Sequence, residues 1–305
     1  MSFLPRDFIE TREGLIFAVV DGFIEEGKVL CFLRYDPSGK LTTQAANSLL
    51  TANFPQYLHH SIRLDTDLHA VPVDCIARHH QPRARARELL AKSPADAIET
   101  KLLSLLKMLM ELGLPVDVFG VTGSLLIGRQ TMHSDVDVVI YGRDYFFRAI
   151  AKVNELKAEG VLDDLNESAW RDAYARRGCE LSFKEYLWHE RRKGNMGLID
   201  GTKFDLALIV EELIENIQRD WQKLGPMVIK ARVLDDAQSF EQPARYLINH
   251  ADIGEVLSFT QTYTGQARIG ETIEAAGQVE LSSDGRKRLV VGSSREALGQ
   301  YIRVI

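Results

Sequence analysis

Two aspartates spaced two residues apart are the strongest candidates for chemistry in this sequence. Asp135 and Asp137 lie at the start of the apolar run 136–141, which reads as a β-strand. Side chains two apart project from the same face of a strand, so the carboxylates lie side by side while Val136 and Val138 point into the core. Adjacent negative charges repel unless water or a cation compensates them. Oxygen ligands alone favour a hard ion, so the pair predicts Mg²⁺ or Mn²⁺ rather than zinc.

A Gly-Ser pair precedes the aspartates by a short loop. Gly123 and Ser124 follow a predicted strand at 116–121, and ten residues separate Ser124 from Asp135. Glycine lets a ligand approach the backbone closely, and backbone N–H groups beside a hydroxyl can bind phosphate. A phosphate-binding turn facing a double-carboxylate metal site is suited to phosphoryl or nucleotidyl transfer. A plain tight turn is the alternative interpretation.

A third carboxylate, Asp205, interrupts the otherwise apolar predicted strand 202–210. An unpaired carboxylate buried there would cost several kcal/mol, so it requires a metal, a basic partner or water. If this strand lies beside the strand of Asp135 and Asp137, then Asp205 completes a three-carboxylate site. The alternative is a structural ion pair with a neighbour such as Lys203.

These residues together resemble the DNA polymerase β-type nucleotidyltransferase superfamily. The likeness rests on Gly123-Ser124, the ten-residue spacing, Asp135-x-Asp137 and the later Asp205, and is strongest to uncharacterised members with extra domains on both sides. It covers about residues 93–222, under half of the chain, and implies a mixed sheet with helices behind it. One departure is the separation of 205 − 137 = 68 residues between the last two carboxylates. That separation implies a helical insertion.

The resemblance also implies roles for these residues. Gly123 and Ser124 would hold the β- and γ-phosphates of an NTP such as ATP. Asp135, Asp137 and Asp205 would be the catalytic residues and the metal ligands, and Asp205 would help to deprotonate the acceptor hydroxyl. The implied reaction transfers a nucleoside monophosphate to that hydroxyl and releases pyrophosphate.

The loop between the motifs contributes further candidates. Arg129 and His133 could contact phosphate or acceptor, and otherwise they are solvated; Arg129 is included in the nucleotide-binding set. Basic stretches at 78–87 and 176–193 and an expected small β-barrel make RNA the first expectation for the acceptor. The alternatives are a linker at 78–87 and a solvated helix face at 176–193. A small molecule or a protein hydroxyl stays open as acceptor.

Two other functions are compatible with the motifs. One is a catalytically silent protein that keeps the fold and binds nucleotide or RNA, although no expected site residue is missing. The other is a minimal nucleotidyltransferase-type antitoxin, which the length disfavours because such chains are short.

The composition is that of an ordinary globular protein. The 305 residues are 45% hydrophobic, with 37 Lys+Arg against 43 Asp+Glu for a net charge of −6. This excludes disordered, collagen-like and disulfide-scaffold classes, and the three cysteines lack any C-x-x-C spacing. With no apolar run near ~20 residues and no leader pattern, we expect a cytoplasmic protein without a membrane span. The sequence does not indicate an oligomeric state.

We expect an α+β protein of three domains. An N-terminal α+β module occupies 1–92, the nucleotidyltransferase core 93–224, and a β-rich domain, expected to be a small β-barrel, 225–305. In the first domain we predict strands at 15–20, 29–35 and 70–77 and a helix at 43–52. In the core we predict a long helix capped by Ser93 and Pro94, strands at 116–121, 136–141, 196–199 and 202–210, and helices at 145–157, 169–177, 183–192 and 211–222. In the last domain we predict strands at 227–234, 245–249, 254–263, 271–281, 288–291 and 301–305.

Overall fold

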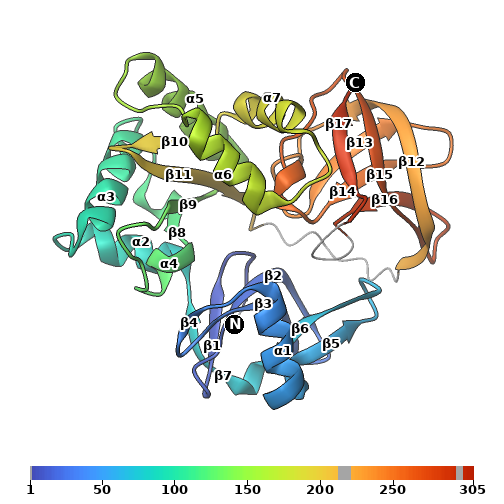
Figure 1. The fold of residues 1–305 in the computed structure, drawn as a ribbon, viewed down its shortest axis with the longest axis horizontal. Coiled ribbons are helices and arrows are strands. Elements are labelled where there is room, and N and C mark those ends of the chain that lie inside the picture. Colours follow the sequence, from blue (N-terminus) through green and yellow to red (C-terminus); the bar gives the residue numbers. More distant parts are fainter. Residues whose placement is uncertain (1, 212–220, 293–297) are drawn as a thin grey trace. The chain divides into compact units, whose positions relative to one another are not determined.

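The computed structural model describes residues 2–211, 221–292 and 298–305. The chain divides into two compact units: unit 1 comprises residues 1–61, 67–163 and 195–213, and unit 2 comprises 62–66, 164–194 and 214–305. The structure confirms a mixed α+β protein with several sheets (Figure 1). The three domains bounded near residues 92 and 224 stay a prediction. None of the helices in the described ranges has the length and apolar character needed to cross a membrane.

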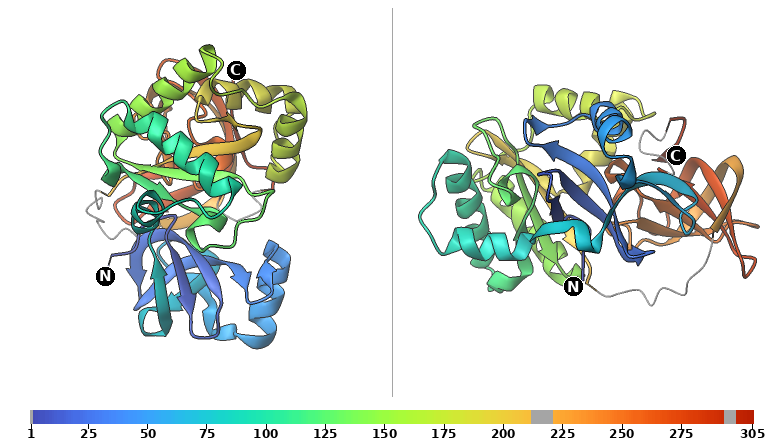
Figure 2. Two further views of the ribbon diagram at one scale, coloured as in Figure 1. Left: turned by 90° about the vertical axis from the view of Figure 1, so that its left-hand side faces the viewer. Right: turned by 90° about the horizontal axis from the view of Figure 1, so that it is seen from below.

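Unit 1 begins with a seven-stranded sheet in the order β5-β6-β3-β2-β1-β7, with β4 beside β3. Helix α1 (Thr43–Asn53) packs against this sheet, burying Ala46 and Leu50 among the apolar side chains of β2 and β3 (Figure 2). The predicted strands 15–20 and 29–35 form an antiparallel hairpin, in which the first strand continues to Glu25, before a turn at Glu26 and Gly27. The strands are β1 (Phe8–Thr11), β2 (Ile16–Glu25), β3 (Lys28–Asp36), β4 (Gly39–Lys40), β5 (Leu58–Ser61), β6 (Thr66–Pro72) and β7 (Ile76–His80).

A second sheet in unit 1 carries the candidate site. Its order is β10-β11-β9-β8, with β9 and β11 parallel and the outer pairs antiparallel. Helices α3 (Ala97–Met110) and α5 (Arg143–Ala158) contact its strands (Figure 1). This is the mixed sheet with helices that the resemblance implies. The strands are β8 (Phe119–Val121), β9 (Val136–Tyr141), β10 (Met196–Ile199) and β11 (Thr202–Ile209), so the predicted strand 116–121 begins instead with the short 3-10 helix Val116–Val118.

The N-terminus of α3 differs from the prediction. The cap is Asp96, whose carboxylate accepts the amide of Glu99 at 2.8 Å, rather than Ser93. Glu99 in turn accepts the amide of Ala95 at 2.7 Å. The two side chains thus satisfy two amides at the start of the helix, similar to a capping box. The helix therefore begins at Ala97, after the Ser-Pro step.

The basic stretch before α3 forms an unpredicted helix, α2 (Pro82–Leu90). Proline at the first helical position is favoured there because its missing amide hydrogen has no partner to lose. Three arginines of α2 are bound within unit 1: Arg83 to Glu211 at 2.8 Å, Arg85 to the carbonyl of Leu125 at 2.9 Å, and Arg87 to Asp117 at 2.8 Å. These arginines connect segments around the second sheet, so α2 has a structural role.

Unit 2 combines a helical insertion with a six-stranded sheet. Helices α6 (Glu167–Arg177) and α7 (Phe183–Lys193) lie where helices are predicted. The remaining short helix, α4 (Gly123–Leu126), is part of unit 1 and follows β8. In the sheet, β12 pairs with both β13 and β15, while the closed barrel itself stays a prediction. Most of the predicted helix 211–222 lies outside the described residues, but its end is wrong because Trp221 already begins β12. The strands are β12 (Trp221–Asp235), β13 (Ala244–Asn249), β14 (Glu255–Ser258), β15 (Thr272–Ser282), β16 (Lys287–Val291) and β17 (Tyr301–Val304).

Helix α7 is anchored to the C-terminal part of unit 2. The Lys193 ammonium pairs with Glu190 and donates to the carbonyl of Thr262 at 2.8 Å, and all three residues are buried. His189 Nε2 accepts the amide of Val304 at 3.1 Å. The basic run at the end of α7 is therefore partly committed to internal contacts, and the insertion folds with the C-terminal sheet.

Unit 2 is expected to lose stability in acid because of Glu274 on β15. Hydrogen bonds from Tyr301 and Arg303 and a salt bridge from Lys230 lower the pKa of Glu274 from 4.5 to about 2. The ionised form is thus favoured in the folded state, so its stabilisation is complete above pH 4.5 and disappears as the pH falls towards 2. We expect Glu274→Gln to lower the unfolding temperature at neutral pH but less near pH 2, measured by circular dichroism. A difference that stays constant across this range would contradict the assignment.

Candidate active site

The parallel pair β9–β11 brings two of the predicted carboxylates together. Asp137 on β9 is the direct register partner of Asp205 on β11. Their preceding neighbours, Val136 and Phe204, are also partners and are both fully buried. Because side chains alternate along a strand, Asp137 and Asp205 share the opposite face, on strands about 4.8 Å apart. The expectation that these strands are neighbours is confirmed.

Each flanking carboxylate has a polar partner in unit 1. Asp135 accepts from the ammonium of Lys203 at 3.4 Å, and Asp205 accepts from the side-chain amide of Asn195 at 3.1 Å. Lys203, which the sequence suggested as a partner of Asp205, pairs with Asp135. Within the described ranges, no three His, Cys, Asp or Glu side chains are grouped closely enough to hold a metal ion as they stand.

Gly123 lies directly against Asp137. Its backbone has a φ of +66°, and a Cβ built on it would lie 2.3 Å from Asp137 Oδ2. The preceding Thr122 donates its amide to the carbonyl of Asp137 at 3.0 Å. Only glycine combines this left-handed backbone with such a close approach. The Gly-Ser turn and the Asp-x-Asp strand are therefore one packed unit.

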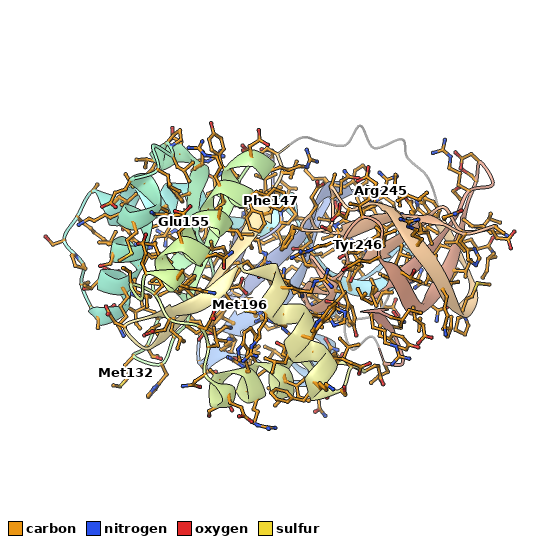
Figure 3. The ribbon with its side chains drawn as sticks, turned by 90° about the horizontal axis from the view of Figure 1, so that it is seen from above. Met132, Phe147, Glu155, Met196, Arg245 and Tyr246 are labelled. Carbon is orange, nitrogen blue, oxygen red and sulfur yellow. The ribbon has the colours of Figure 1, made fainter. Side chains whose placement is uncertain are left out.

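Ser124 faces the loop that connects the turn to β9. Its hydroxyl donates to Ser134 Oγ at 3.2 Å, and Ser134 Oγ also accepts the amide of Thr131 at 2.9 Å. Met132 at the loop tip is 81% exposed and lies at the outer edge of unit 1 in Figure 3. The neighbouring His133 is likewise exposed. The loop thus holds the serine while leaving its own tip in solvent.

Arg129 is directed to the N-terminal sheet. Its guanidinium donates to the carbonyl of Asp36 at 2.6 Å and lies 5.9 Å from the ring centre of Tyr35. Its amide donates to the carbonyl of Ser124 at 2.9 Å. Arg129 therefore ties the motif loop to the end of β3, and its contact with a nucleotide stays a prediction.

The electrostatics at Asp137 favour a bound cation. Burial and the neighbouring Asp135 raise the pKa of Asp137, while the positive charges of Lys203, Arg6 and Lys40 partly lower it. A divalent ion would offset the same repulsion between carboxylates. The donors here are carboxylate oxygens, the ligand type that Mg²⁺ and Mn²⁺ prefer.

Sequence reasoning missed Asn195. This residue follows the end of α7, and its side-chain amide donates to Asp205 Oδ1 and to the carbonyl of Leu206 at 3.0 Å. Among the described residues its Oδ1 atom is buried with no hydrogen-bond partner. An asparagine before a strand carries no signal for this role, because the contact depends on the pairing of β10 with β11.

Comparison with known proteins identifies the fold around this site. The family model of the nucleotidyltransferase domain matches residues 102–225. The matched span contains the turn, the aspartate pair and Asp205. The chain belongs to the polymerase β-type nucleotidyltransferases. An uncharacterized protein of Methanocaldococcus jannaschii is 34% identical to it over 333 aligned residues, covering 98% of each chain. No solved structure matches the nucleotidyltransferase chain.

Proposed function

We propose that the chain is a divalent-metal-dependent nucleotidyltransferase that moves a nucleoside monophosphate from an NTP to an acceptor hydroxyl. The observation that carries this proposal is the register of Asp137 with Asp205 beside the Gly123 turn. Family membership supports nucleotidyl transfer in general. The metal, the NTP and the residue roles are our inference from these side chains.

Three carboxylates would hold the metal: Asp135, Asp137 and Asp205. A bound Mg²⁺ or Mn²⁺ would lower the pKa of the acceptor hydroxyl and neutralise charge on the phosphates. Asp135 would exchange its contact with Lys203 for the ion, and such an exchange is inexpensive for a partly exposed pair at 3.4 Å. The unpartnered Oδ1 of Asn195 supplies a further polar atom next to Asp205.

The remaining steps use the chain's own groups. The amides of the Gly123-Ser124 turn and the Ser124 hydroxyl would bind the β- and γ-phosphates. The acceptor oxygen attacks the α-phosphorus, a new O–P bond forms, and the bond to the β-phosphate oxygen breaks. Pyrophosphate leaves with that electron pair, and Asp205 accepts the proton of the hydroxyl.

RNA is our proposed acceptor. Within unit 2, Trp188 on α7 is 51% exposed, and the guanidinium of Arg192, which also pairs with Glu271 at 2.5 Å, lies 4.3 Å from its ring centre. An exposed aromatic ring with neighbouring arginines is a common surface for stacking and backbone contact with single-stranded RNA. A small-molecule or protein hydroxyl is the other outcome that the assay below distinguishes.

The function can be tested by incubating the protein with each labelled NTP, Mg²⁺ and total RNA. We expect label to enter RNA, and to be lost with EDTA and in Asp135→Asn. Label on a small molecule or on protein would retain the transferase and replace the acceptor. Nucleotide binding without transfer under Mg²⁺ or Mn²⁺ would contradict the enzyme and support the catalytically silent alternative.

Asn195→Ala is expected to lower kcat about 10- to 100-fold with little change in KM for the NTP. The reason is that Asn195 orients Asp205 without lying in the phosphate-binding turn, and partners of metal ligands typically contribute this much. Initial rates against NTP concentration measure both constants. Asn154→Ala, on the exposed side of α5, is the matched control and should have no effect. An increase confined to KM would contradict a role through Asp205.

A further inference from the structure

The N-terminal sheet packs against the elements of the candidate site. Leu126, at the end of α4, lies in an apolar cluster with Phe8, Ile16 and Tyr35 of the N-terminal sheet. Burying these side chains together holds the sheet against the helix that begins at Gly123. The N-terminal strands are therefore in position to contribute side chains to the site.

A second contact lies on the strands that carry the aspartates. Leu4 packs against a buried cluster of Val139 and Tyr141 on β9 and Ile209 on β11. The segment before β1 thus crosses the same two strands that carry Asp137 and Asp205. Two separate apolar contacts define the orientation of the N-terminal sheet better than one contact could.

Between these contacts, a strained turn presents Arg6. The amide of Asp7 donates to the carbonyl of Leu4 at 3.1 Å, with Pro5 and Arg6 at the two central positions. Arg6 has a φ of 80°, a conformation that favours glycine at the third position of such a turn. Its carbonyl accepts the hydroxyl of Thr122 at 3.0 Å, one residue before Gly123. The bonds of the Arg6 amide to the carbonyl of Val19 and of its carbonyl to Thr122 hold the arginine in this conformation next to the glycine turn.

Lys40 reaches the same region from β4. It is the antiparallel partner of Tyr35, so the two side chains share a face of the sheet. Tyr35 lies in the cluster with Leu126. Burial raises the pKa of Tyr35, the charge of Arg34 lowers it, and the charge of Asp137 adds to the increase. The turn between β3 and β4 is held to the motif loop through the bond from Arg129 to the carbonyl of Asp36. Lys40 is exposed and therefore accessible to a ligand.

The electrostatics agree with this placement. Arg6 and Lys40 are cationic residues on segments that contact the glycine turn: the Arg6 carbonyl accepts from Thr122, and Lys40 is paired with Tyr35, which packs against Leu126. Lys203 already neutralises part of Asp135 from the opposite strand. An incoming triphosphate adds several negative charges at this point, and both arginine and lysine are strong phosphate ligands.

We propose that Arg6 and Lys40 complete the triphosphate subsite by binding the β- and γ-phosphates of the NTP held at Gly123 and Ser124. The inference rests on the proposed function. It makes the N-terminal sheet part of the nucleotide site.

The test measures equilibrium binding of each NTP with Mg²⁺ to the full chain. In Arg6→Gly and in Lys40→Ala we expect the Kd for the preferred NTP to rise about tenfold, equivalent to about 1.4 kcal/mol. In both variants, inorganic tripolyphosphate should also compete with the NTP about tenfold less well than it does in the wild type. The Kd of the matching NMP should not change. The unfolding temperature of Arg6→Gly should equal or exceed that of the wild type, since glycine relieves the positive φ.

Lys28→Ala is the control, because Lys28 lies at the other end of β3 from Tyr35. An equal loss of affinity in Lys28→Ala, or an equal loss for NMP and NTP, would overturn the phosphate contact. Wild-type affinity in both test variants would also overturn it while leaving the proposed transferase intact. If the wild-type protein itself neither binds nor transfers any NTP, the proposed function fails instead. If Arg6→Gly is unstable, the Kd of Lys40→Ala decides the test, because Lys40 is exposed and its substitution leaves the core unchanged.

Discussion

Asp137→Asn is expected to lower kcat/KM for nucleotide transfer by about a thousandfold while leaving the fold intact. The substitution keeps the shape of the side chain but removes the charge that would hold the metal. Loss of several kcal/mol of transition-state stabilisation corresponds to a factor of about ten for each 1.4 kcal/mol. Label transfer measured over a range of NTP concentrations gives the ratio.

The same variant should be at least as stable as the wild type. Burial and the charge of Asp135 raise the pKa of Asp137, so ionisation at neutral pH costs the folded state free energy that the neutral amide does not. Thermal unfolding at pH 7 checks this expectation. Asp200→Asn, in the exposed turn between β10 and β11 where φ is +45°, is the control because asparagine also adopts that conformation. An active Asp137→Asn enzyme would show that Asp137 is not a metal ligand.

Gly123→Ala should reduce both stability and activity. Alanine at this position would have to keep a φ of +66°, and its Cβ would lie 2.3 Å from Asp137 Oδ2. The carboxylate or the turn must therefore move. We expect the free energy of unfolding to fall by about 2–4 kcal/mol, the sum of left-handed strain and overpacking. We also expect kcat to fall about a hundredfold, since a shift near 1 Å at a reacting group has that effect.

Gly128 separates the two causes. It has nearly the same φ, +65°, in the same loop, but a Cβ there would have no atom within 4 Å. Gly128→Ala should therefore lose only the strain contribution, about 1–2 kcal/mol, and retain most of its activity. Denaturant unfolding and initial rates compare the variants. Equal losses in Gly123→Ala and Gly128→Ala would show that the contact with Asp137 is unimportant.

Local patterns in the sequence were enough to place the aspartates. Alternation in β9 puts Val136 and Val138 inside and Asp137 on the other face, and burial of both valines agrees. The close approach of a ligand to Gly123 stays a prediction, and the structure adds that the glycine packs against Asp137. The prediction for β9 succeeded because it depends on a period of two.

Predictions near segment ends were weaker. Ser93 was expected to cap α3, but Asp96 does so, because both residue types cap helices and the sequence does not choose between them. The arginines of α2 were read as a linker or an RNA surface. Their partners Glu211 and Asp117 lie 128 and 30 residues away along the chain, beyond the reach of any local pattern.

The sequence by itself determined the candidate groups: a carboxylate pair, a glycine-serine turn and a third aspartate on an apolar strand. Only the tertiary structure decided what surrounds them. Asn195 reaches Asp205 through the pairing of β10 with β11, and Arg6 meets Thr122 across 116 residues of chain. Residue type and short spacing encode which groups can react. Long-range packing, which no local pattern contains, brings the N-terminal cations to the reacting groups.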